Sequence, residues 1–243
     1  MFGAVIQIAG ILDQREAEML LFTGIDLLGF PLRLDYHRED LDQSGAGRII
    51  RKLRIQRQAT VITYLHTATD VLDLCEAVGA GHLQLHGDIQ LDQLALIRAS
   101  RPGLSIIKSL IVRDDNPDEL STRMQCWERY VDAFIVDSYD DSSGASGATG
   151  KVHDWTVSRA LVERSRRPVL LAGGLTPENV GEAIRQVRPA GVDAHTGVEG
   201  TDGRKSRDRV SSFVAAARAA FCGRRQGSAA GRPSGIASEE LKN

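Results

Sequence analysis

Asp137 is the residue whose type and position most directly suggest acid–base chemistry. It follows the apolar run Ala133 to Val136, which is typical of a buried strand. A carboxyl group at the end of such a strand meets a pocket in which burial can tune it for proton transfer. The alternative is that Asp137 caps a loop, and spacing alone does not decide between the two roles.

Residues 170–180, LLAGGLTPENV, have the composition of a strand that turns directly into a helix. Gly173 and Gly174 allow a sharp turn and a close approach of the backbone to a ligand. Thr176 is predicted to cap the following helix and Pro177 to be its first residue. The free N–H groups of such a turn favour a phosphate, although two glycines can also do no more than close a tight loop.

A second glycine-bearing turn follows the last apolar run, residues 191–194. His195, Thr196 and Gly197 come directly after that run. In a parallel barrel the loops after the last two strands lie side by side and often bind phosphate together. Thr196 and Gly197 are therefore predicted to share a phosphate site with the Gly-Gly turn.

Lys108 lies within the apolar run Leu104 to Ile111, where an unpaired ammonium group is costly. It is predicted either to form a structural ion pair or to contact the substrate, and a Schiff base is a further alternative. His66 and His86 also stand at the ends of apolar runs. Both are candidate proton acceptors, because the histidine side chain ordinarily titrates near neutral pH.

These residues need a scaffold that gathers the ends of many strands at one place. Short apolar runs alternate with helical patterns, and the runs are continuous rather than alternating, as in strands buried between helices. This order predicts a single parallel (β/α)₈ barrel of the α/β class. A doubly wound open sheet is the rival, but no strand is followed by a GxGxxG turn. The predicted strands are residues 3–10, 24–30, 59–65, 82–85, 104–111, 131–136, 168–172 and 191–194.

The helices of this outline come between those strands, and the barrel is predicted to occupy residues 1–221. A long loop is expected over residues 137–151, and residues 222–243 are predicted to be a disordered tail because they are rich in Gly, Ser, Ala and Arg without periodicity. The predicted helices are residues 13–22, 48–57, 69–78, 90–99, 117–129, a helix from Trp155, a helix from Pro177 and residues 205–221.

Composition narrows the choice of partners. With 243 residues, 42% hydrophobic residues and a net charge of −2, the chain has no basic excess for nucleic acid. No apolar run approaches the roughly 18 residues needed to span a membrane, and no targeting segment is seen. The cysteines Cys75, Cys126 and Cys222 lack metal-ligand spacing. We expect reduced thiols, a cytoplasmic protein, no metal site, and either a monomer or a homodimer.

Several motifs in register resemble the phosphoribosylanthranilate isomerase family over roughly residues 3–221. The family carries QLHG, an Asp-ended sixth strand, GGTGKxFDW, SGGLxPENV and VDxSSGVExxxGxKD. The corresponding segments here are HLQLHGD (82–88), IIKS (106–109), IVDS (135–138), GATGKVHDW (147–155), LAGGLTPENV (171–180) and GVDAHTGVEGTDGRKS (191–206).

The resemblance implies a (β/α)₈ barrel that binds a phosphorylated ribose derivative and performs an Amadori rearrangement in tryptophan biosynthesis without a cofactor. One group protonates the furanose ring oxygen and another removes the proton from sugar C2. Asp137 falls on the family's general acid and Arg38 on the arginine that contacts the anthranilate moiety. His86 belongs to the QLHG motif and is a substrate-binding candidate. Gly150, Gly173, Gly174, Thr196 and Gly197 fall on the phosphate site.

The sequence departs from the family at the first strand. The family begins KxCGI and uses its cysteine as the general base, whereas this chain has Gln7 and Ala9 in place of the lysine and the cysteine. Loss of a positioned base typically costs two to four orders of magnitude in rate. His195 is a further departure, because it replaces a serine of the family. It is predicted first as a phosphate donor and second as a replacement base, with a polar surface residue as the alternative.

Three functions follow from this combination. The leading hypothesis is a diverged member of the family that performs acid–base chemistry on a phosphorylated sugar or a related phosphate ester. The second is the isomerase of phosphoribosylanthranilate itself, working with a replacement base. The third is a non-catalytic protein that binds a phosphorylated metabolite. Fold alone does not separate these hypotheses, because one barrel scaffold supports many reactions.

Overall fold

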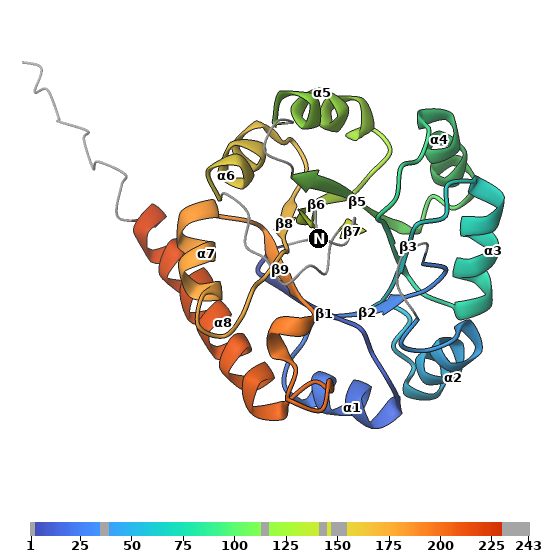
Figure 1. The fold of residues 1–243 in the computed structure, drawn as a ribbon. Coiled ribbons are helices and arrows are strands. Elements are labelled where there is room, and N and C mark those ends of the chain that lie inside the picture. Colours follow the sequence, from blue (N-terminus) through green and yellow to red (C-terminus); the bar gives the residue numbers. More distant parts are fainter. Residues whose placement is uncertain (1–2, 35–38, 113–116, 141–144, 147–154, 230–243) are drawn as a thin grey trace, which may run out of the picture.

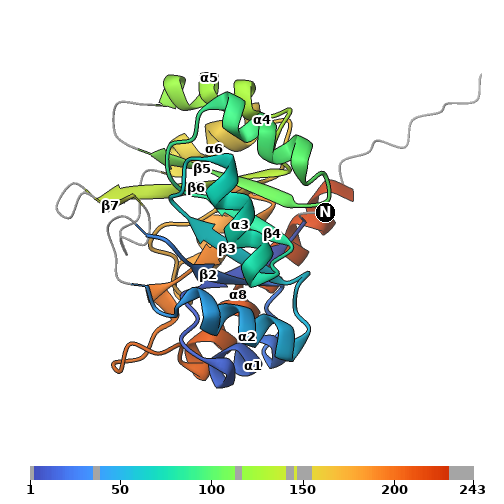
Figure 2. The same cartoon turned by 90° about the vertical axis from the view of Figure 1, so that its right-hand side faces the viewer.

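The computed structural model describes residues 3–34, 39–112, 117–140, 145–146 and 155–229. Figure 1 looks into a ring of strands surrounded by helices, and Figure 2 shows the same molecule from the side. The described helices are α1 (Gln14–Phe22), α2 (Gln43–Leu53), α3 (Ala68–Val78), α4 (Leu91–Ser100), α5 (Pro117–Trp127), α6 (Trp155–Arg164), α7 (Val180–Val187) and α8 (Arg207–Ala229), with the short 3₁₀ helix η1 (Thr196–Val198).

The strands form one closed parallel barrel. Their order is β5-β4-β3-β2-β1-β9-β8-β6, and pairing of β5 with β6 closes the ring. The bounds are β1 (Val5–Ala9), β2 (Leu27–Pro31), β3 (Ala59–Thr63), β4 (His82–Leu85), β5 (Ser105–Val112), β6 (Ala133–Asp140), β8 (Val169–Leu171) and β9 (Gly191–Ala194). The predicted (β/α)₈ barrel is therefore confirmed.

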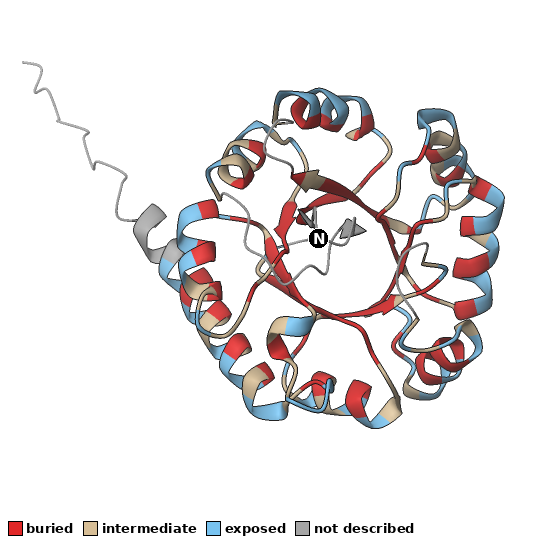
Figure 3. Ribbon diagram, viewed as in Figure 1, coloured by how far each residue is buried: buried red, intermediate tan, exposed pale blue. Residues whose placement is uncertain are grey.

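Side chains point alternately into the barrel and toward the helices, as the pleat of a strand requires. Ile107, Ile135 and Leu170 belong to a small buried cluster inside the barrel. Their neighbours Phe134 and Leu171 belong to the large cluster between strands and helices. Figure 3 shows strands that are buried along most of their length and helices that are buried on the side that faces the strands. This alternation decides which strand residues reach the mouth of the barrel.

Side-chain caps start several helices where the sequence provides an acceptor. The Asp13 carboxylate accepts a hydrogen bond from Glu16 N at 2.9 Å, and that of Asp42 accepts one from Gly45 N at 2.6 Å. Because of the Asp42 cap, α2 spans Gln43–Leu53 rather than the predicted residues 48–57.

Most other boundaries shift by one to three residues, and the differences at α7, β6 and α8 have the clearest consequences. α7 starts at Val180 rather than at Pro177, because residues 177–179 form a turn in which Asn179 Oδ1 accepts a hydrogen bond from Thr176 N at 2.8 Å. β6 continues to Asp140 and pairs antiparallel with β7 (Ala145–Ser146), so the predicted loop begins later. α8 ends at Ala229 instead of residue 221, and residues 230–243 lie outside the described part.

Candidate functional site

Asp137 lies in β6 directly after Val136, the last residue of the strand that pairs with β8, and faces into the mouth of the barrel. It is two residues beyond Ile135, whose side chain is inside the barrel, so the pleat directs Asp137 to the same side. Asp137 Oδ1 accepts a hydrogen bond from Ser138 N at 2.7 Å, and Oδ2 lies 3.5 Å from His86 Nε2. Both side chains are only 7% exposed. The structure therefore brings two of the predicted site residues together.

Both the ring and the backbone of His86 make contacts with neighbouring residues. It contacts Tyr64 edge to face, with the ring centroids 5.4 Å apart. Ser109 Oγ donates a hydrogen bond to the backbone oxygen of His86 at 2.9 Å. Among the described residues, His86 Nδ1 is buried without a hydrogen-bond partner. Such an unpaired buried nitrogen indicates a polar group that a bound molecule can satisfy.

His195 follows β9 and packs against the end of β1. A Cβ atom on Gly10 would collide with the His195 imidazole, and Gly10 has a φ of 79°, so only glycine suits this position. Ala9 directly precedes Gly10, so the imidazole of His195 lies beside the end of β1 that carries Ala9.

Two carboxylates flank the His195 ring. Its Nε2 atom lies 3.6 Å from Glu199 Oε1 and 3.7 Å from Asp40 Oδ2, and its side chain is 23% exposed. Glu199 is held in turn by the buried Lys205, whose Nζ donates to Glu199 Oε1 at 2.6 Å. Sequence reasoning missed Asp40, Glu199 and Lys205, since their relation to His195 depends on loops from separate parts of the chain.

The turns after β8 and β9 meet as the sequence predicts. Gly173 and Gly174 have φ values of 88° and 62°, and added Cβ atoms would strain both positions. A Cβ atom on Gly197 would collide with the backbone oxygen of Leu175, so the two turns touch through their backbones. Thr196 and Gly197 lie in η1. Four of the predicted phosphate-binding residues are thus gathered at one place.

Lys108 is placed differently from the prediction of a substrate contact. It alternates with Ile107, so its side chain points out of the barrel toward α5, where Nζ lies 4.8 Å from the centroid of Trp127. Nζ also donates a hydrogen bond to the backbone oxygen of Ser109 at 3.0 Å. Burial lowers the pKa of Lys108 to about 8. The ammonium is stabilised by an aromatic face. Within the described part of the chain it forms no ion pair, although the charge of Asp88 opposes the lowering of its pKa.

The predicted site residues Arg38 and Gly150 lie outside the described residues. Among the residues that are described, no group of three or more His, Cys, Asp or Glu side chains could hold a metal ion. No described helix has the length and apolar character needed to cross a membrane.

A polar layer lies below the mouth, inside the barrel. Gln7 Nε2 donates to Gln84 Oε1 at 2.8 Å, and Gln7 is paired in register with Asp193 of β9. Burial, and next the charge of Asp137, raise the pKa of Asp193 to about 7. The sequence analysis includes Asp193 only within the motif of residues 191–206. A carboxyl group within an apolar strand is itself a signal of unusual titration.

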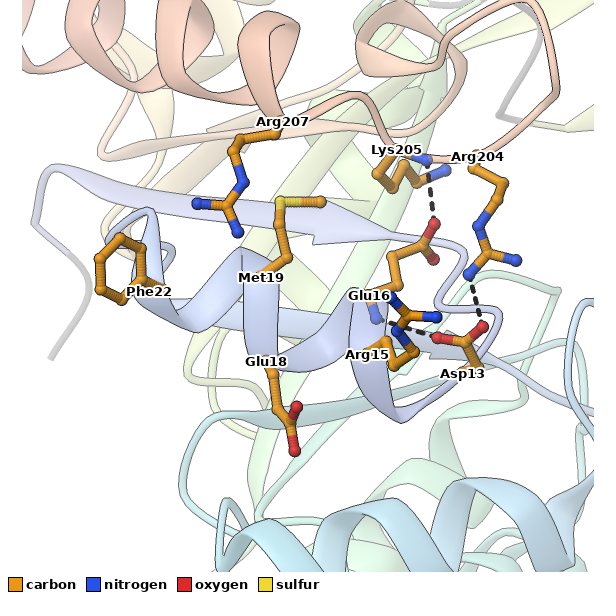
Figure 4. A pocket seen from close by; sticks show the side chains of 9 residues that line it. All are labelled: Asp13, Arg15, Glu16, Glu18, Met19, Phe22, Arg204, Lys205 and Arg207. Carbon is orange, nitrogen blue, oxygen red and sulfur yellow. Dashed lines mark hydrogen bonds and ion pairs between the residues drawn. The ribbon is translucent and has the colours of Figure 1, made fainter.

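A separate surface pocket lies on the outside of the barrel, between α1 and the segment before α8. Figure 4 shows its charged lining, in which Arg204 pairs with Asp13 and the backbone N–H of Lys205 donates to Glu16 at 2.9 Å. Lys205 directs its ammonium group to Glu199, so this wall of the pocket also supports the His195 environment. Its paired charges serve structure, and the reactive side chains face the mouth of the barrel instead.

The fold and the polar strand ends define the class of (β/α)₈-barrel enzymes, whose chemistry takes place at the carboxyl face of the barrel. The family model described as N-(5'-phosphoribosyl)anthranilate (PRA) isomerase matches residues 46–216. The chain belongs to the phosphoribosylanthranilate isomerase family. This membership supports the prediction that the protein is an isomerase.

Curated relatives are similar in sequence to this chain over most of their length. N-(5'-phosphoribosyl)anthranilate isomerase 2 of Methanosarcina mazei is 38% identical over 210 residues, which cover 86% of this chain and 92% of the relative. The isomerase of Haloferax volcanii is 36% identical over 217 residues, with 88% and 93% covered.

Solved structures of the family have the same fold. The phosphoribosylanthranilate isomerase of Thermotoga maritima superimposes with a TM-score of 0.73 at 26% identity. That of Thermococcus kodakaraensis gives a TM-score of 0.72 at 29% identity. In both comparisons 88% of this chain and 98% of the other chain are covered.

Proposed function

We propose that this protein is an isomerase of a phosphorylated aminosugar that uses His195 as the proton acceptor in place of the missing thiol. The observation that carries the proposal is the position of the His195 imidazole, against Gly10 and beside Ala9. The substrate to test first is N-(5'-phosphoribosyl)anthranilate, which the curated relatives are named for. A related phosphate ester is the alternative substrate.

Asp137 is the proposed general acid. It protonates the furanose ring oxygen, the bond from that oxygen to C1 breaks, and the electron pair of the amine nitrogen forms an iminium group. His195 then takes the proton from C2, which gives the enol-amine. The enol-amine becomes the aminoketose when its enol hydroxyl loses a proton and C1 gains one. His195 finally releases its proton to solvent, and Asp137 regains one from solvent. Burial of Asp137 beside His86 supports this role, since a shielded acid transfers its proton efficiently.

The surroundings of His195 favour a base over a phosphate donor. The Asp40 and Glu199 carboxylates lie within 3.7 Å of Nε2. Lys205 compensates the charge of Glu199, but the charge of Asp40 would repel a phosphate dianion. The same carboxylates stabilise an imidazolium after proton transfer. The phosphate is instead assigned to the turns that contain Gly173, Gly174, Thr196 and Gly197, together with Gly150.

The test compares His195→Ala with the double variant His195→Ala/Ala9→Cys. We expect His195→Ala to lower kcat about 10²- to 10⁴-fold, the usual contribution of a positioned base. Ala9→Cys should restore much of that loss, because it returns a thiol to the adjacent strand end. His66→Ala is the matched control, since His66 is another strand-end histidine, and it should leave kcat within about twofold.

Unchanged kcat in His195→Ala would overturn the proposed base. Loss of activity without rescue by Ala9→Cys would be consistent with a structural role for His195 and would also count against the proposal. Asp137→Asn should reduce kcat by a comparable factor, and full activity of that variant would remove Asp137 from the mechanism. Binding of sugar phosphates without turnover of any would favour the non-catalytic alternative.

A further inference from the structure

Arg209, in the first turn of α8, reaches both of the turns assigned to the phosphate. Its Nη2 and Nε atoms donate to the backbone oxygen of Gly197 at 2.8 and 3.2 Å. Nη2 also lies 3.5 Å from the Glu178 carboxylate, which belongs to the turn before α7. One guanidinium group therefore joins the turn after β9 to the turn after β8.

This double contact fixes the orientation of one peptide group. The carbonyl of Gly197 points toward Arg209, and in a trans peptide the N–H of the next residue points the opposite way. The N–H of Val198 is therefore directed away from α8. Backbone N–H groups held in a fixed direction are the donors that anion sites use.

The approach of the two turns leaves little room for adjustment. Gly197 lies against the backbone oxygen of Leu175 so closely that a Cβ atom would not fit. A guanidinium forms its two hydrogen bonds in a planar fork, which fixes both the distance and the angle of its acceptor. Arg209 thus holds the contact between Gly197 and Leu175 from the outer side of the barrel.

We infer that Arg209 is a positioning residue that preorganises the phosphate-binding turns by fastening the Gly197 carbonyl and Glu178 together. The inference rests on the proposed function, which assigns the phosphate to these turns. Without Arg209, binding of the phosphate must also order the turns, and this cost weakens binding. The chemical step at Asp137 and His195 should be affected much less.

The experiment measures inorganic phosphate binding by calorimetry, together with KM, kcat and Tm, for Arg209→Met and Arg209→Lys. We expect Arg209→Met to weaken phosphate binding about tenfold and to raise KM by a similar factor, with kcat within about twofold. Arg209→Lys should recover only part of the loss, because an ammonium group lacks the planar fork.

Arg218→Met is the matched control. Arg218 lies in the same helix and also binds backbone carbonyls, those of Ala4 and Gly24, and it pairs with Asp26 at 2.6 Å. Those partners lie near the amino ends of the strands, away from the phosphate-binding turns. Arg218→Met should lower Tm while leaving phosphate binding unchanged.

Equal phosphate binding by wild type and Arg209→Met would overturn the inference. An equal loss in Arg218→Met would also overturn it, because the effect would then reflect stability alone. If the wild type itself binds no phosphate, the assignment of the phosphate to these turns fails before any variant is compared. If phosphate binds but no isomerisation is found, the proposed function fails while the binding comparison still tests Arg209.

Discussion

Asp193 shows how burial changes the chemistry of a carboxyl group on a barrel strand. It faces the barrel interior, and Gln7 is paired with it in register on β1. Glutamine hydrogen-bonds but carries no charge, so the buried carboxylate has no cation on the adjacent strand. Burial and the charge of Asp137 raise its pKa to about 7, while Gln7 and Lys205 act in the opposite direction. At pH values between the ordinary pKa of 3.8 and about 7, the neutral acid is therefore favoured in the folded state, whereas an exposed aspartate is ionised.

This raised pKa predicts a pH-dependent stability. Between the ordinary value of 3.8 and about 7, the folded protein holds a proton that the unfolded chain has lost. The free energy of unfolding should therefore fall as pH rises through this range, by on the order of 2–4 kcal/mol. Asp193→Asn should remove this decline, as measured by urea unfolding at pH 4, 5.5 and 8.

Gln7→Lys provides a second comparison at the same site. A lysine next to Asp193 should favour the ionised carboxylate and reduce the decline in stability. An unchanged pH dependence in both variants would show that other groups control it.

At the scale of the element, the pleat of β5 decides the role of Lys108. Ile107 and Ser109 face the barrel interior, and Lys108 points to α5, where it lies over Trp127. A strand of continuous apolar character carries no signal of which side is inside, because both sides are buried. The substrate contact of Lys108 therefore stays a prediction, and the outward direction of its side chain argues against it.

Lys108→Met tests this placement. The variant should keep kcat and KM within about twofold, because Lys108 does not face the substrate. Burial lowers the pKa of Lys108 to about 8 from 10.5, so wild-type stability should rise as pH increases between these values. The free energy of unfolding of Lys108→Met, measured by chemical denaturation, should not rise between pH 8 and pH 10.

The exposed Lys52 on α2 provides the control. Lys52→Met should retain the wild-type rise in stability between pH 8 and pH 10. More than a tenfold loss of kcat in a folded Lys108→Met variant would contradict this placement and would indicate that Lys108 takes part in the active site.

At the scale of the whole molecule, closure of the barrel is what brings distant residues together. Pairing of β5 with β6 closes the ring of strands, and α8 packs against α7 and α1 to complete the outer layer. Figure 1 shows α8 alongside α7, with α1 on its other side. The site depends on this outer layer, because Arg209 and Arg218 both extend from α8 to loops or strands of the barrel.

Phe213→Ala tests how far the whole barrel depends on α8. Phe213 is fully buried in the main core, so its truncation should lower the free energy of unfolding by about 3–5 kcal/mol. Phe22→Ala is the control, because Phe22 is 83% exposed and its loss should cost less than about 1 kcal/mol. Chemical denaturation gives both values, and similar values would contradict the central packing of α8.

The sequence predicted the barrel because its signals are local. Apolar runs, helical patterns and glycine turns each depend on a few neighbouring residues, and they recovered the parallel strands and the positions of most helices. The errors at α2 and α7 have local causes as well. The cap by Asp42 and the turn that Asn179 holds were not recognised.

The sequence by itself determined the family, the fold, the carboxyl group that follows the apolar part of β6 and the two glycine turns. Only the tertiary structure decided that the His86 ring lies next to the Asp137 carboxyl group and that His195 packs against Gly10. It also decided that Lys108 points out of the barrel toward α5. The physical reason is that these contacts join residues from different strands, as Gln7 and Gln84 do across 77 positions. Such contacts depend on the direction of each side chain in the pleat and on closure of the ring, and neither is a property of a short segment.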